Sequence, residues 1–461
     1  MARGAHAAPR GRDAVQSGAR DAVVNSARDP SGLAARRAAL HTLERVRKGE
    51  PLDAALDRSL TGLPDDDRRL AHELAAGVLR AQSSLDARLA PLVPRGWPQV
   101  APALQDLLRL GAYQITGLDR VPAHAAVSTS VALAREVGGQ RATGFVNAVL
   151  RHVAADPAPE RTAPAGESDS TRLAETHSHP EWLVRRWIER FGADATRVLL
   201  ERNNTRPGLV LQPARAPLDE LQKRWEAAGI SVVPAPFGAG LATDRTRPGD
   251  LPGFAEGDFV VQDPAQALVA WFADLPPDVA TYDACAAPGG KTIALGRETR
   301  AVVAGDVSRR RAARLSENVR RAGSGREHVV VADALHPPIR SAGAVLLDAP
   351  CLGTGTFARH PDARWRVTPE ALAALAERQA EMLDAAAAVV EPGGLLVYST
   401  CSLEPEENEF QIDRFIERHP EFRREPGEGF PPTLLSARGD LMILPHRHGM
   451  DGAFAARLRR A

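Results

Sequence analysis

The spacing of apolar and polar residues divides the chain into a helical first part and a second part in which strands and helices alternate. Between residues 33 and 155, apolar side chains recur at intervals of three and four, as in Leu70, Leu74 and Val78, which is typical of amphipathic helices. Proline and glycine interrupt this pattern, for example at Pro94 and Gly96. The pattern therefore predicts a compact all-α domain of about five to seven helices.

From residue 265 onward, short apolar runs alternate with amphipathic stretches. The longest amphipathic stretch begins at Pro369, with Thr368 in the N-cap position. This alternation predicts an α/β domain over residues 265–461, with a doubly wound, mostly parallel sheet. The predicted strands are Val279–Ala284, Val302–Asp306, Val329–Ala332, Ala344–Asp348 and Leu395–Ser399, and the clearest predicted helices are Ser308–Ala322 and Pro369–Val390.

Three further segments follow neither pattern. Residues 1–32 are rich in Ala, Arg, Gly, Ser and Asp without periodicity, which predicts a disordered tail. Residues 156–176 have little apolar content, which predicts a linker. Residues 177–264 combine a helical connector, marked by Trp182 and Trp187, with short strands and a helix near Leu218–Ala228. We interpret this last region as a connector followed by a small α+β unit.

Composition narrows the choice of environment and partners. The formal net charge is zero, with 58 basic and 58 acidic residues, so a nucleic-acid surface has to come from local clustering of charge. No apolar stretch approaches the ~20 residues that span a bilayer, and the first residues lack the apolar core of a signal peptide. The three cysteines include no C-x-x-C pair, which argues against a structural zinc site. We therefore expect a reduced, cytoplasmic chain with no metal and no membrane segment.

The three cysteines, Cys285, Cys351 and Cys401, each come just after a predicted strand. Ligands bind at the carboxyl ends of the strands in open α/β sheets, and a thiol is the most nucleophilic side chain near neutral pH. One such cysteine alone would be interpreted as a small buried hydrophobe. Three cysteines in this position, and none elsewhere, indicate a site.

The first of these cysteines belongs to a glycine-rich turn with the sequence Asp-Ala-Cys-Ala-Ala-Pro-Gly-Gly-Lys-Thr, residues 283–292. The glycines let backbone approach a ligand, and the helix that follows offers N–H donors to an anion. Gly-Lys-Thr resembles a P-loop, but Cys285 stands where the P-loop needs its first glycine, and Pro288 stiffens the turn. The alternative is a nucleoside cofactor such as S-adenosylmethionine.

Acidic residues at successive strand ends favour the nucleoside cofactor. Asp283 ends the first predicted strand, and Asp306 ends the second, about 20 residues further on, where a carboxylate meets ribose hydroxyls in dinucleotide-type folds. Asp333 follows the third strand, where it can accept a hydrogen bond from an adenine amino group. Each acid alone is more typical of a helix cap or a solvated loop. Their joint placement favours a cofactor site.

The residues that follow the fourth and fifth predicted strands indicate a reactive site beside the cofactor. One crossover helix separates them, so we expect them to be neighbours, with Asp348 and Cys351 after the fourth and Cys401 after the fifth. Two thiols and a carboxylate beside a methyl donor suggest attack on an aromatic carbon that is too unreactive to take a methyl group unaided. Cytosine C5 is such a carbon: a thiolate that adds to C6 makes C5 nucleophilic, and an acid near N3 assists.

At these residues the chain resembles the RNA 5-methylcytosine methyltransferases of the NOL1/NOP2/Sun type, over about residues 177 to 461. The resemblance implies that Cys401 is the nucleophile, that Cys351 assists release of the product, and that Asp348 orients or protonates the base. Departures are a missing Arg-x-Asn, where Gly208–Gln212 stands instead, and Leu352 in place of the usual serine. The cofactor-binding residues that the resemblance implies are Cys285, Ala286, Ala287, Pro288, Gly289, Gly290, Lys291, Asp306, Asp333 and Asp348.

The N-terminal helices resemble NusB-type RNA-binding domains, in segments 73–77, 108–113 and 144–151. Residues 33–155 hold 16 basic and 12 acidic side chains, 16 minus 12 giving +4, which is modest support for contact with RNA phosphates. This pairing of domains resembles the bacterial family members that act on 16S ribosomal RNA. It implies an enzyme that uses S-adenosylmethionine to methylate C5 of a cytosine in that RNA, free or in an assembling particle, and we expect this enzyme to be a monomer.

Three alternatives remain open at this point. The substrate could be a tRNA or another RNA. A P-loop ATPase would bind ATP with Mg²⁺ and ignore S-adenosylmethionine. A non-catalytic NusB-like RNA-binding factor would have a degenerate second half. The complete set of motifs argues against such degeneracy.

Overall fold

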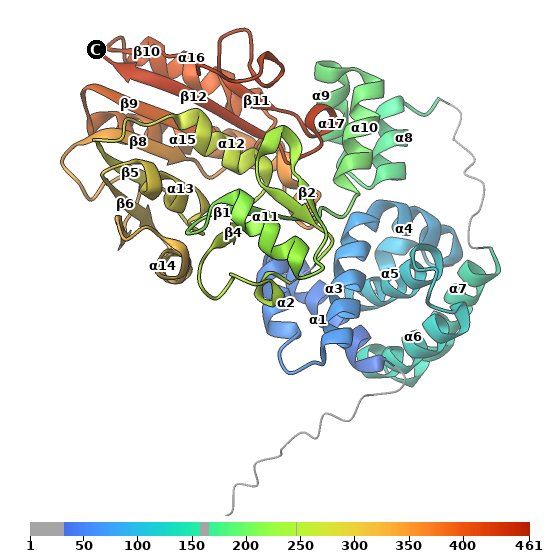
Figure 1. The fold of residues 1–461 in the computed structure, drawn as a ribbon. Helices are drawn as coiled ribbons and strands as arrows, with labels where there is room; N and C mark the ends of the chain where they lie inside the picture. The colour runs from blue at the N-terminus through green and yellow to red at the C-terminus, as the bar shows by residue number, and fades with distance from the viewer. Residues whose placement is uncertain (1–31, 157–165, 246) are drawn as a thin grey trace, which may run out of the picture.

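The computed structural model describes residues 32–156, 166–245 and 247–461. The predicted tail lies outside the described residues except for Gly32. Along the chain, a helical domain comes first, followed by three connector helices, a small sheet and a large sheet (Figure 1). Within the described part of the chain, no helix is long and apolar enough to cross a membrane.

The first domain is all-α, as predicted. Its core is formed by buried leucines such as Leu74, Leu107 and Leu150, which lie on the inward faces of amphipathic helices. Gly77 of α3 faces the ring of Tyr113 of α5, and a Cβ at this position would overlap that ring. The helices are α1 (Leu33–Arg47), α2 (Leu52–Ser59), α3 (Asp65–Arg80), α4 (Gln82–Leu89), α5 (Pro102–Gly117), α6 (Ala123–Gly138) and α7 (Gln140–Ala155).

The connector consists of α8 (Asp169–His177), α9 (Glu181–Phe191) and α10 (Ala193–Asn203). The prediction of a linker over residues 156–176 is wrong for its last part, because α8 begins at Asp169. The side chain of Ser168 accepts a hydrogen bond from the N–H of Thr171 at 3.1 Å, and Leu173 is buried in the connector core. A helix that buries so few apolar residues leaves little periodic signal in the sequence. Residues 157–165 of the predicted linker lie outside the described residues.

The small unit is the predicted α+β fold. Its four strands form an antiparallel sheet in the order β2-β3-β1-β4. Trp225 of the single α-helix packs edge-on against Phe259 of the sheet, with ring centroids 5.1 Å apart. Gln212, which stands in the region of the missing Arg-x-Asn, is buried and donates to the carbonyl of Ala239 at 2.9 Å. The elements are β1 (Leu209–Pro213), α11 (Leu218–Ala227), β2 (Val232–Pro234), β3 (Leu241–Thr243) and β4 (Phe259–Val261).

The large sheet has the strand order β10-β12-β9-β8-β5-β6-β7, with β11 paired to β12. Strands β5 to β9 run parallel, and β12 is antiparallel to β9, so the prediction of a mostly parallel sheet is confirmed. The strands are β5 (Ala280–Ala284), β6 (Ala301–Asp306), β7 (Glu327–Val331), β8 (Ala342–Asp348), β9 (Val390–Thr400), β10 (Phe422–Arg424), β11 (Leu441–Ile443) and β12 (Ala453–Arg460). The helices of this domain are α12 (Pro264–Ala273), α13 (Gly290–Glu298), α14 (Arg309–Ala322), α15 (Pro369–Ala388), α16 (Glu409–Arg418) and α17 (Pro445–His448).

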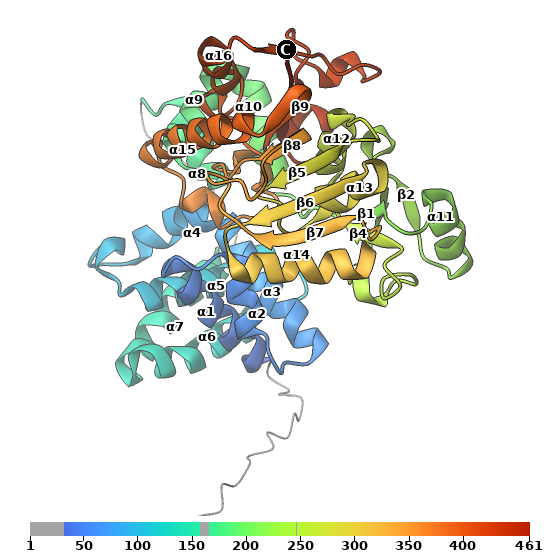
Figure 2. The ribbon, with the colours of Figure 1, turned by 90° about the vertical axis from the view of Figure 1, so that its left-hand side faces the viewer.

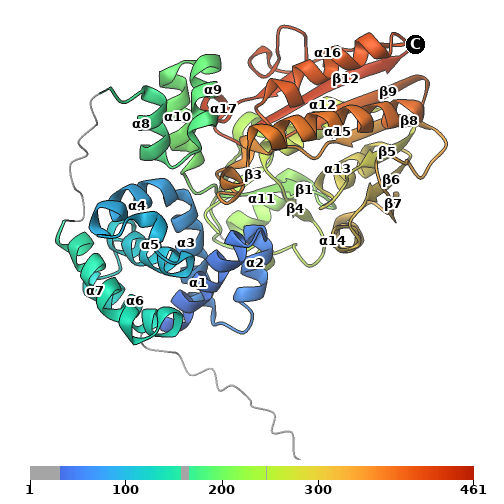
Figure 3. The same ribbon diagram turned by 180° about the vertical axis from the view of Figure 1, so that it is seen from behind.

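Helices cover both faces of this sheet, which explains why its strands are apolar at nearly every position. Val345 and Leu347 of β8 pack in the same cluster as Leu383 of α15. The alternate residues Ala344 and Leu346 belong to the opposite cluster, with residues of α13 and α14. Figure 2 shows α14 beside β6 and β7, and Figure 3 shows α15 and α16 over β8, β9 and β12. The chain proceeds outward from β5 in both directions, and such a switch point is where ligands bind in open α/β sheets.

Candidate active site

The glycine-rich turn leaves β5 at Cys285, whose φ of 63° lies in the left-handed region. Gly289, with φ of 107°, caps α13, and a Cβ there would come 2.7 Å from Leu315 Cδ1. The turn is fastened on both sides: the N–H of Ala286 donates to the carbonyl of Gly305 at 2.9 Å, and Asn318 Nδ2 donates to the carbonyl of Pro288 at 2.9 Å. The predicted turn is therefore a rigid element at the carboxyl edge of the sheet.

Asp283 lies beneath this turn. Its side chain is fully buried, and its Oδ2 accepts a hydrogen bond from Thr292 Oγ1 at 2.6 Å. Its Oδ1 is buried with no hydrogen-bond partner in the described structure. Burial raises the pKa of Asp283 to about 7. This strand-end acid thus braces the start of α13, which differs from the cofactor contact that its spacing suggests.

Lys291 connects the turn to Asp348. Its ammonium is 2.8 Å from Asp348 Oδ2 and also donates to Gln266 Oε1. Asp348 Oδ1 accepts from Ser399 Oγ at 2.7 Å, and the two residues are partners in the β8–β9 register. Lys291 is buried, whereas about a third of the Asp348 side chain, 31%, is exposed. Asp348 is therefore held from two sides with part of its carboxylate open to the edge of the sheet.

Asp306 and Asp333 lie at the ends of β6 and β7, as predicted. Asp306 is 2% exposed, and its Oδ1 accepts from the N–H of Ser308 at 2.8 Å and from Arg311 Nε at 3.0 Å. Within the described residues, its Oδ2 has no hydrogen-bond donor. Asp333 Oδ1 accepts from the N–H of Leu335 at 3.1 Å, and its Oδ2 lies 3.6 Å from Arg378.

Two of the three thiols are in contact. Cys351 Sγ and Cys401 Sγ are 3.3 Å apart, and the N–H of Cys401 points at Cys351 Sγ over 3.4 Å. Both cysteines are free thiols. The hydrogen bond with Cys401, together with burial, holds the pKa of Cys351 well above its usual range. The prediction that the two strands are neighbours is confirmed, because β8 pairs with β9.

Cys285 does not share this arrangement. No hydrogen bond in the described part of the chain joins it to the other two thiols, and it packs at the margin of the core cluster on one face of the sheet. Burial raises the pKa of Cys285 to about 12, which makes it a poor nucleophile. Three cysteines at strand ends therefore form one pair and one separate residue of the turn.

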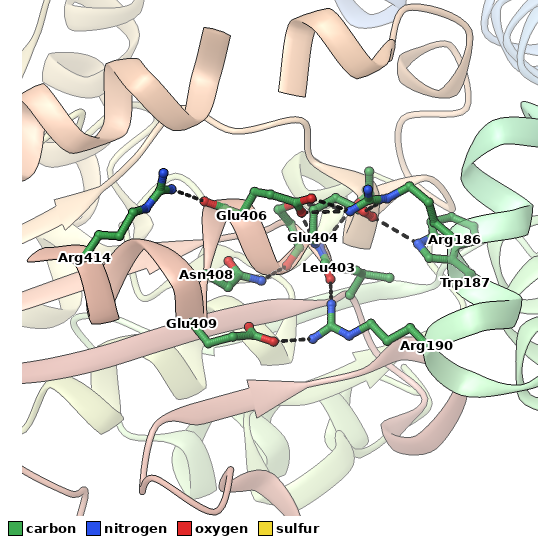
Figure 4. A network of polar contacts seen from close by, with 11 residues as sticks. Arg186, Trp187, Arg190, Leu403, Glu404, Glu406, Asn408, Glu409 and Arg414 are labelled. Atoms are coloured by element: carbon green, nitrogen blue, oxygen red, sulfur yellow. Dashed lines mark hydrogen bonds and ion pairs between the residues drawn. The ribbon is translucent and has the colours of Figure 1, made fainter. Parts of the chain in front are cut away.

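The segment that follows Cys401 is held by the connector helix α9 (Figure 4). Trp187 Nε1 and Arg186 Nε donate to the two oxygens of Glu404 at 3.1 Å and 3.0 Å. Arg186 also binds Glu406, and Arg190 binds the carbonyl of Leu403 and the carboxylate of Glu409. Glu404 is 2% exposed, whereas 32% of the Arg186 side chain is exposed, so the carboxylate is the shielded partner of this ion pair.

Sequence reasoning missed this contact and the contacts made by Glu407, Ser399 and Gln266. Glu407 accepts from the N–H of Leu352 at 3.0 Å and from Gln379 Nε2 at 2.9 Å, which joins the segments after both cysteines. Ser399 and Gln266, described above, support Asp348 and Lys291. The available signal was the run Glu-Pro-Glu-Glu-Asn-Glu at residues 404–409, directly after the Thr-Cys pair, because clustered acids so near a thiol require cationic partners.

The strand order, the glycine-rich turn and the strand-end acids define a Rossmann-like methyltransferase domain, here joined to a NusB-like helical domain. Residues 272–459 match the family model of the 16S rRNA methyltransferase RsmB/F, residues 33–155 match that of the NusB family, and residues 179–245 match the RsmF/B-like ferredoxin-like domain. The chain belongs to the family of the ribosomal RNA small subunit methyltransferase B.

Individual relatives match nearly the whole chain. It is 35% identical to the probable ribosomal RNA small subunit methyltransferase B of Synechocystis sp., over 93% of this chain and 100% of that protein. It is 36% identical to the ribosomal RNA small subunit methyltransferase B of Thermus thermophilus, over 92% of this chain and 97% of that protein. The crystal structure of PH0851 superimposes with a TM-score of 0.78 at 26% identity, covering 93% and 99% of the two chains. NSun6 from Pyrococcus horikoshii, at 20% identity and a TM-score of 0.55, shares the fold over 61% of this chain and 98% of that chain.

The burial of Asp283 predicts a specific dependence of stability on pH. Because its pKa in the folded protein is about 7 and exceeds the value of an unfolded aspartate, the folded state binds the proton more tightly. The stabilisation that this proton gives the folded state is present at low pH. The free energy of unfolding therefore falls as the pH rises from about 4 to about 7. Asp283→Asn, which keeps an acceptor for Thr292, should lose this decline.

Denaturant unfolding at about pH 5 and pH 8 measures the effect. The exposed Asp278→Asn is the matched control and should retain the pH dependence of the unmodified protein. Equal pH dependence in the unmodified protein and in Asp283→Asn would contradict the assignment.

Proposed function

We propose that this protein transfers a methyl group from S-adenosylmethionine to C5 of a cytosine in small-subunit (16S) ribosomal RNA, through a covalent bond between Cys401 and C6 of the base. The observation that carries the proposal is the pair of thiols, 3.3 Å apart, at the ends of two paired strands. Asp348 belongs to the same edge of the sheet, three residues before Cys351. Membership in the methyltransferase family supports the cofactor and speaks against a P-loop ATPase.

The residues of the turn fit a nucleoside cofactor. Asp306 presents one carboxylate oxygen without a protein donor within the described residues, which suits the hydroxyl groups of a ribose. Lys291, the lysine expected in a P-loop to reach phosphates, is instead bound to Asp348 at 2.8 Å. We assign residues Cys285 to Lys291, Asp306, Asp333 and Asp348 to the cofactor site. Bound S-adenosylmethionine would supply an electrophilic methyl group there.

The two thiols take different roles in this mechanism. The Cys401 thiolate adds to C6, a C–S bond forms, and the electron pair of the C5–C6 double bond makes C5 the nucleophile that takes the methyl group. Asp348 orients the ring or supplies a proton near N3. A base then removes the C5 proton, the double bond re-forms, and the C–S bond breaks to return the Cys401 thiolate. The family resemblance assigns the attack to Cys401, the cysteine of the Thr-Cys pair, and leaves Cys351, the cysteine of the Pro-Cys pair, to assist release.

The domain division completes the proposal: residues 33–155 bind RNA, residues 177–264 connect and contribute RNA contacts, and residues 265–461 perform the methyl transfer. The positive balance of the first domain supports its role, because phosphate binding uses clustered arginine and lysine. Arg120, Arg141 and Arg151 are exposed on this domain and form no ion pair within the described residues.

A first test concerns the cofactor. Asp306→Asn keeps an acceptor for the N–H of Ser308 but removes the charge. It should weaken S-adenosylmethionine binding by ~1.5–3 kcal/mol, or about 10- to 150-fold, because a charged hydrogen bond to the ribose is lost. Calorimetry measures the affinity, with Ser308→Ala as a control that perturbs the start of α14 alone. An unchanged affinity in a folded Asp306→Asn protein would refute the assignment.

A second test separates the thiols. Cys401→Ala should bind S-adenosylmethionine but form neither a covalent adduct nor product. Cys351→Ala should attack and then stall, which leaves a protein–RNA species that survives denaturing electrophoresis. Flipping of the target base is expected, since a thiol cannot reach C6 inside a stack. A stable adduct in Cys401→Ala and none in Cys351→Ala would reverse the two roles.

A third test concerns RNA binding. Replacing Arg120, Arg141 and Arg151 together by glutamine should weaken binding of the target RNA and flatten its salt dependence, by ~0.7 in the log–log slope for each lost phosphate contact. Arg423→Gln, an exposed change on β10, is the control. A slope equal to that of the unmodified protein would argue against these contacts, and tighter binding of a tRNA than of 16S RNA would favour the other substrate class.

A further inference from the structure

The segment between Cys351 and α15 contacts the thiol pair, the connector and the helical domain. We call residues 352–367 the docking loop. At its start, the N–H of Gly355 donates to the carbonyl of Cys401 at 3.0 Å, and the N–H of Leu352 donates to Glu407 at 3.0 Å. Through these hydrogen bonds, the positions of the two thiols depend on the conformation of this loop.

The far end of the docking loop is inserted into the helical domain. Trp365 packs against the hydrophobic core of that domain, and its Nε1 donates to the carbonyl of Leu79 at 2.8 Å. Asp362 Oδ2 accepts from the N–H of Leu52 at 3.1 Å. Helix α2 begins after Pro51 without a side-chain cap of its own, so a carboxylate 310 residues away satisfies its first N–H.

Between Asp362 and Trp365, the same end of the loop is also locked to the connector. The Arg364 side chain is fully buried and donates to the carbonyls of Ser178 at 3.1 Å and Asn203 at 2.9 Å, and to Asn204 Oδ1 at 2.7 Å. Burial lowers the pKa of Arg364 to about 9. A buried guanidinium that depends on backbone carbonyls is satisfied in one arrangement only, so the loop has little freedom while the helices are in place.

The helical domain also meets other segments directly, through a part-buried hydrogen bond from the N–H of Ser84 to Ser178 Oγ at 3.1 Å and through two ion pairs that are more exposed. Arg247 pairs with Asp65, and Arg206 with Glu73, and the side chains of both arginines are more than a third exposed. Such pairs contribute little to docking. From the docking loop, Trp365 adds an apolar contact with the core of the helical domain, and Figures 1 and 3 show this domain beside the rest of the molecule.

We propose that the docked helical domain positions Cys351 through the docking loop, with Trp365 and Asp362 as positioning residues, in addition to any role in binding RNA. Loss of the Trp365 anchor leaves Asp362 and Arg364 to hold the far end of the loop, and a shift of these residues reaches Cys351 through the backbone between them. The assignment of Cys351 to product release rests on the proposed function, whereas the positioning itself does not.

The test uses the full chain with Trp365→Ala and, as a control, Trp97→Ala. Trp97 packs against the same core cluster but forms no hydrogen bond with the docking loop within the described residues, so both variants remove an indole from one core cluster. Trp365→Phe, which keeps an apolar ring and loses the N–H, provides a milder variant in case Trp365→Ala does not fold.

The first readout needs no RNA. Alkylation of each thiol by iodoacetamide is followed by mass spectrometry, with the unmodified protein as the reference. Trp365→Ala, and to a smaller extent Trp365→Phe, should raise the alkylation rate of Cys351 above that in the unmodified protein, while Trp97→Ala should not. An unchanged rate in Trp365→Ala overturns the proposal.

The second readout is the covalent adduct with target RNA, run beside Cys351→Ala. Trp365→Ala should bind S-adenosylmethionine and RNA as the unmodified protein does, and should accumulate adduct. Its turnover rate should fall by about tenfold or more, since a misplacement of a reacting group near 1 Å can lower the rate ~100-fold. If Cys351→Ala accumulates adduct and Trp365→Ala does not, the positioning proposal fails. If neither accumulates adduct while alkylation changes as expected, the release role of Cys351 fails and the positioning stands.

Discussion

The parallel pairing of β8 with β9 is the constraint on which the candidate site depends. The register sets Asp348 opposite Ser399, so the chain segments that leave the two strands start side by side. Further contacts, from Glu407 to Leu352 and from Gly355 to Cys401, then hold the two thiols at 3.3 Å. Because the apolar residues of β8 and β9 are buried on both faces, a shift in this register would misplace the entire core, and the geometry of the thiols is thereby tied to the stability of the domain.

The charges around the thiols are arranged so that each buried group has a defined partner. Lys291 neutralises Asp348, and Trp187 and Arg186 together satisfy Glu404. Such pairs contribute less to stability than their number suggests, because desolvation offsets most of the attraction. Their effect is to restrict the site to one arrangement, since removal of one member would leave an uncompensated charge in the interior. The same reasoning applies to Arg364, whose partners come from the connector and from the loop itself.

The sequence was sufficient for the features that depend on periodicity or local chemistry. Alternating strands and helices predict the parallel sheet, and one crossover helix between Asp348 and Ser399 predicts neighbouring strands. It was insufficient where the partners are distant in the chain: Arg186 and Glu404 are 218 residues apart, and Leu52 and Asp362 are 310 residues apart. Contacts of this kind follow from the packing of whole domains. The burial of Asp283 was missed for a related reason, since a strand end alone does not show which side chains face outward.

The central claim is that the thiol pair serves methylation of cytosine in the small ribosomal subunit. The most direct measurement is a map of 5-methylcytosine in the ribosomal RNA and tRNA of cells that lack this gene, with or without a plasmid copy of the unmodified gene or of Cys401→Ala. The account predicts that a 16S position loses its methyl group, regains it with the unmodified copy and does not regain it with Cys401→Ala. An unchanged 16S map, or restoration by Cys401→Ala, would contradict it.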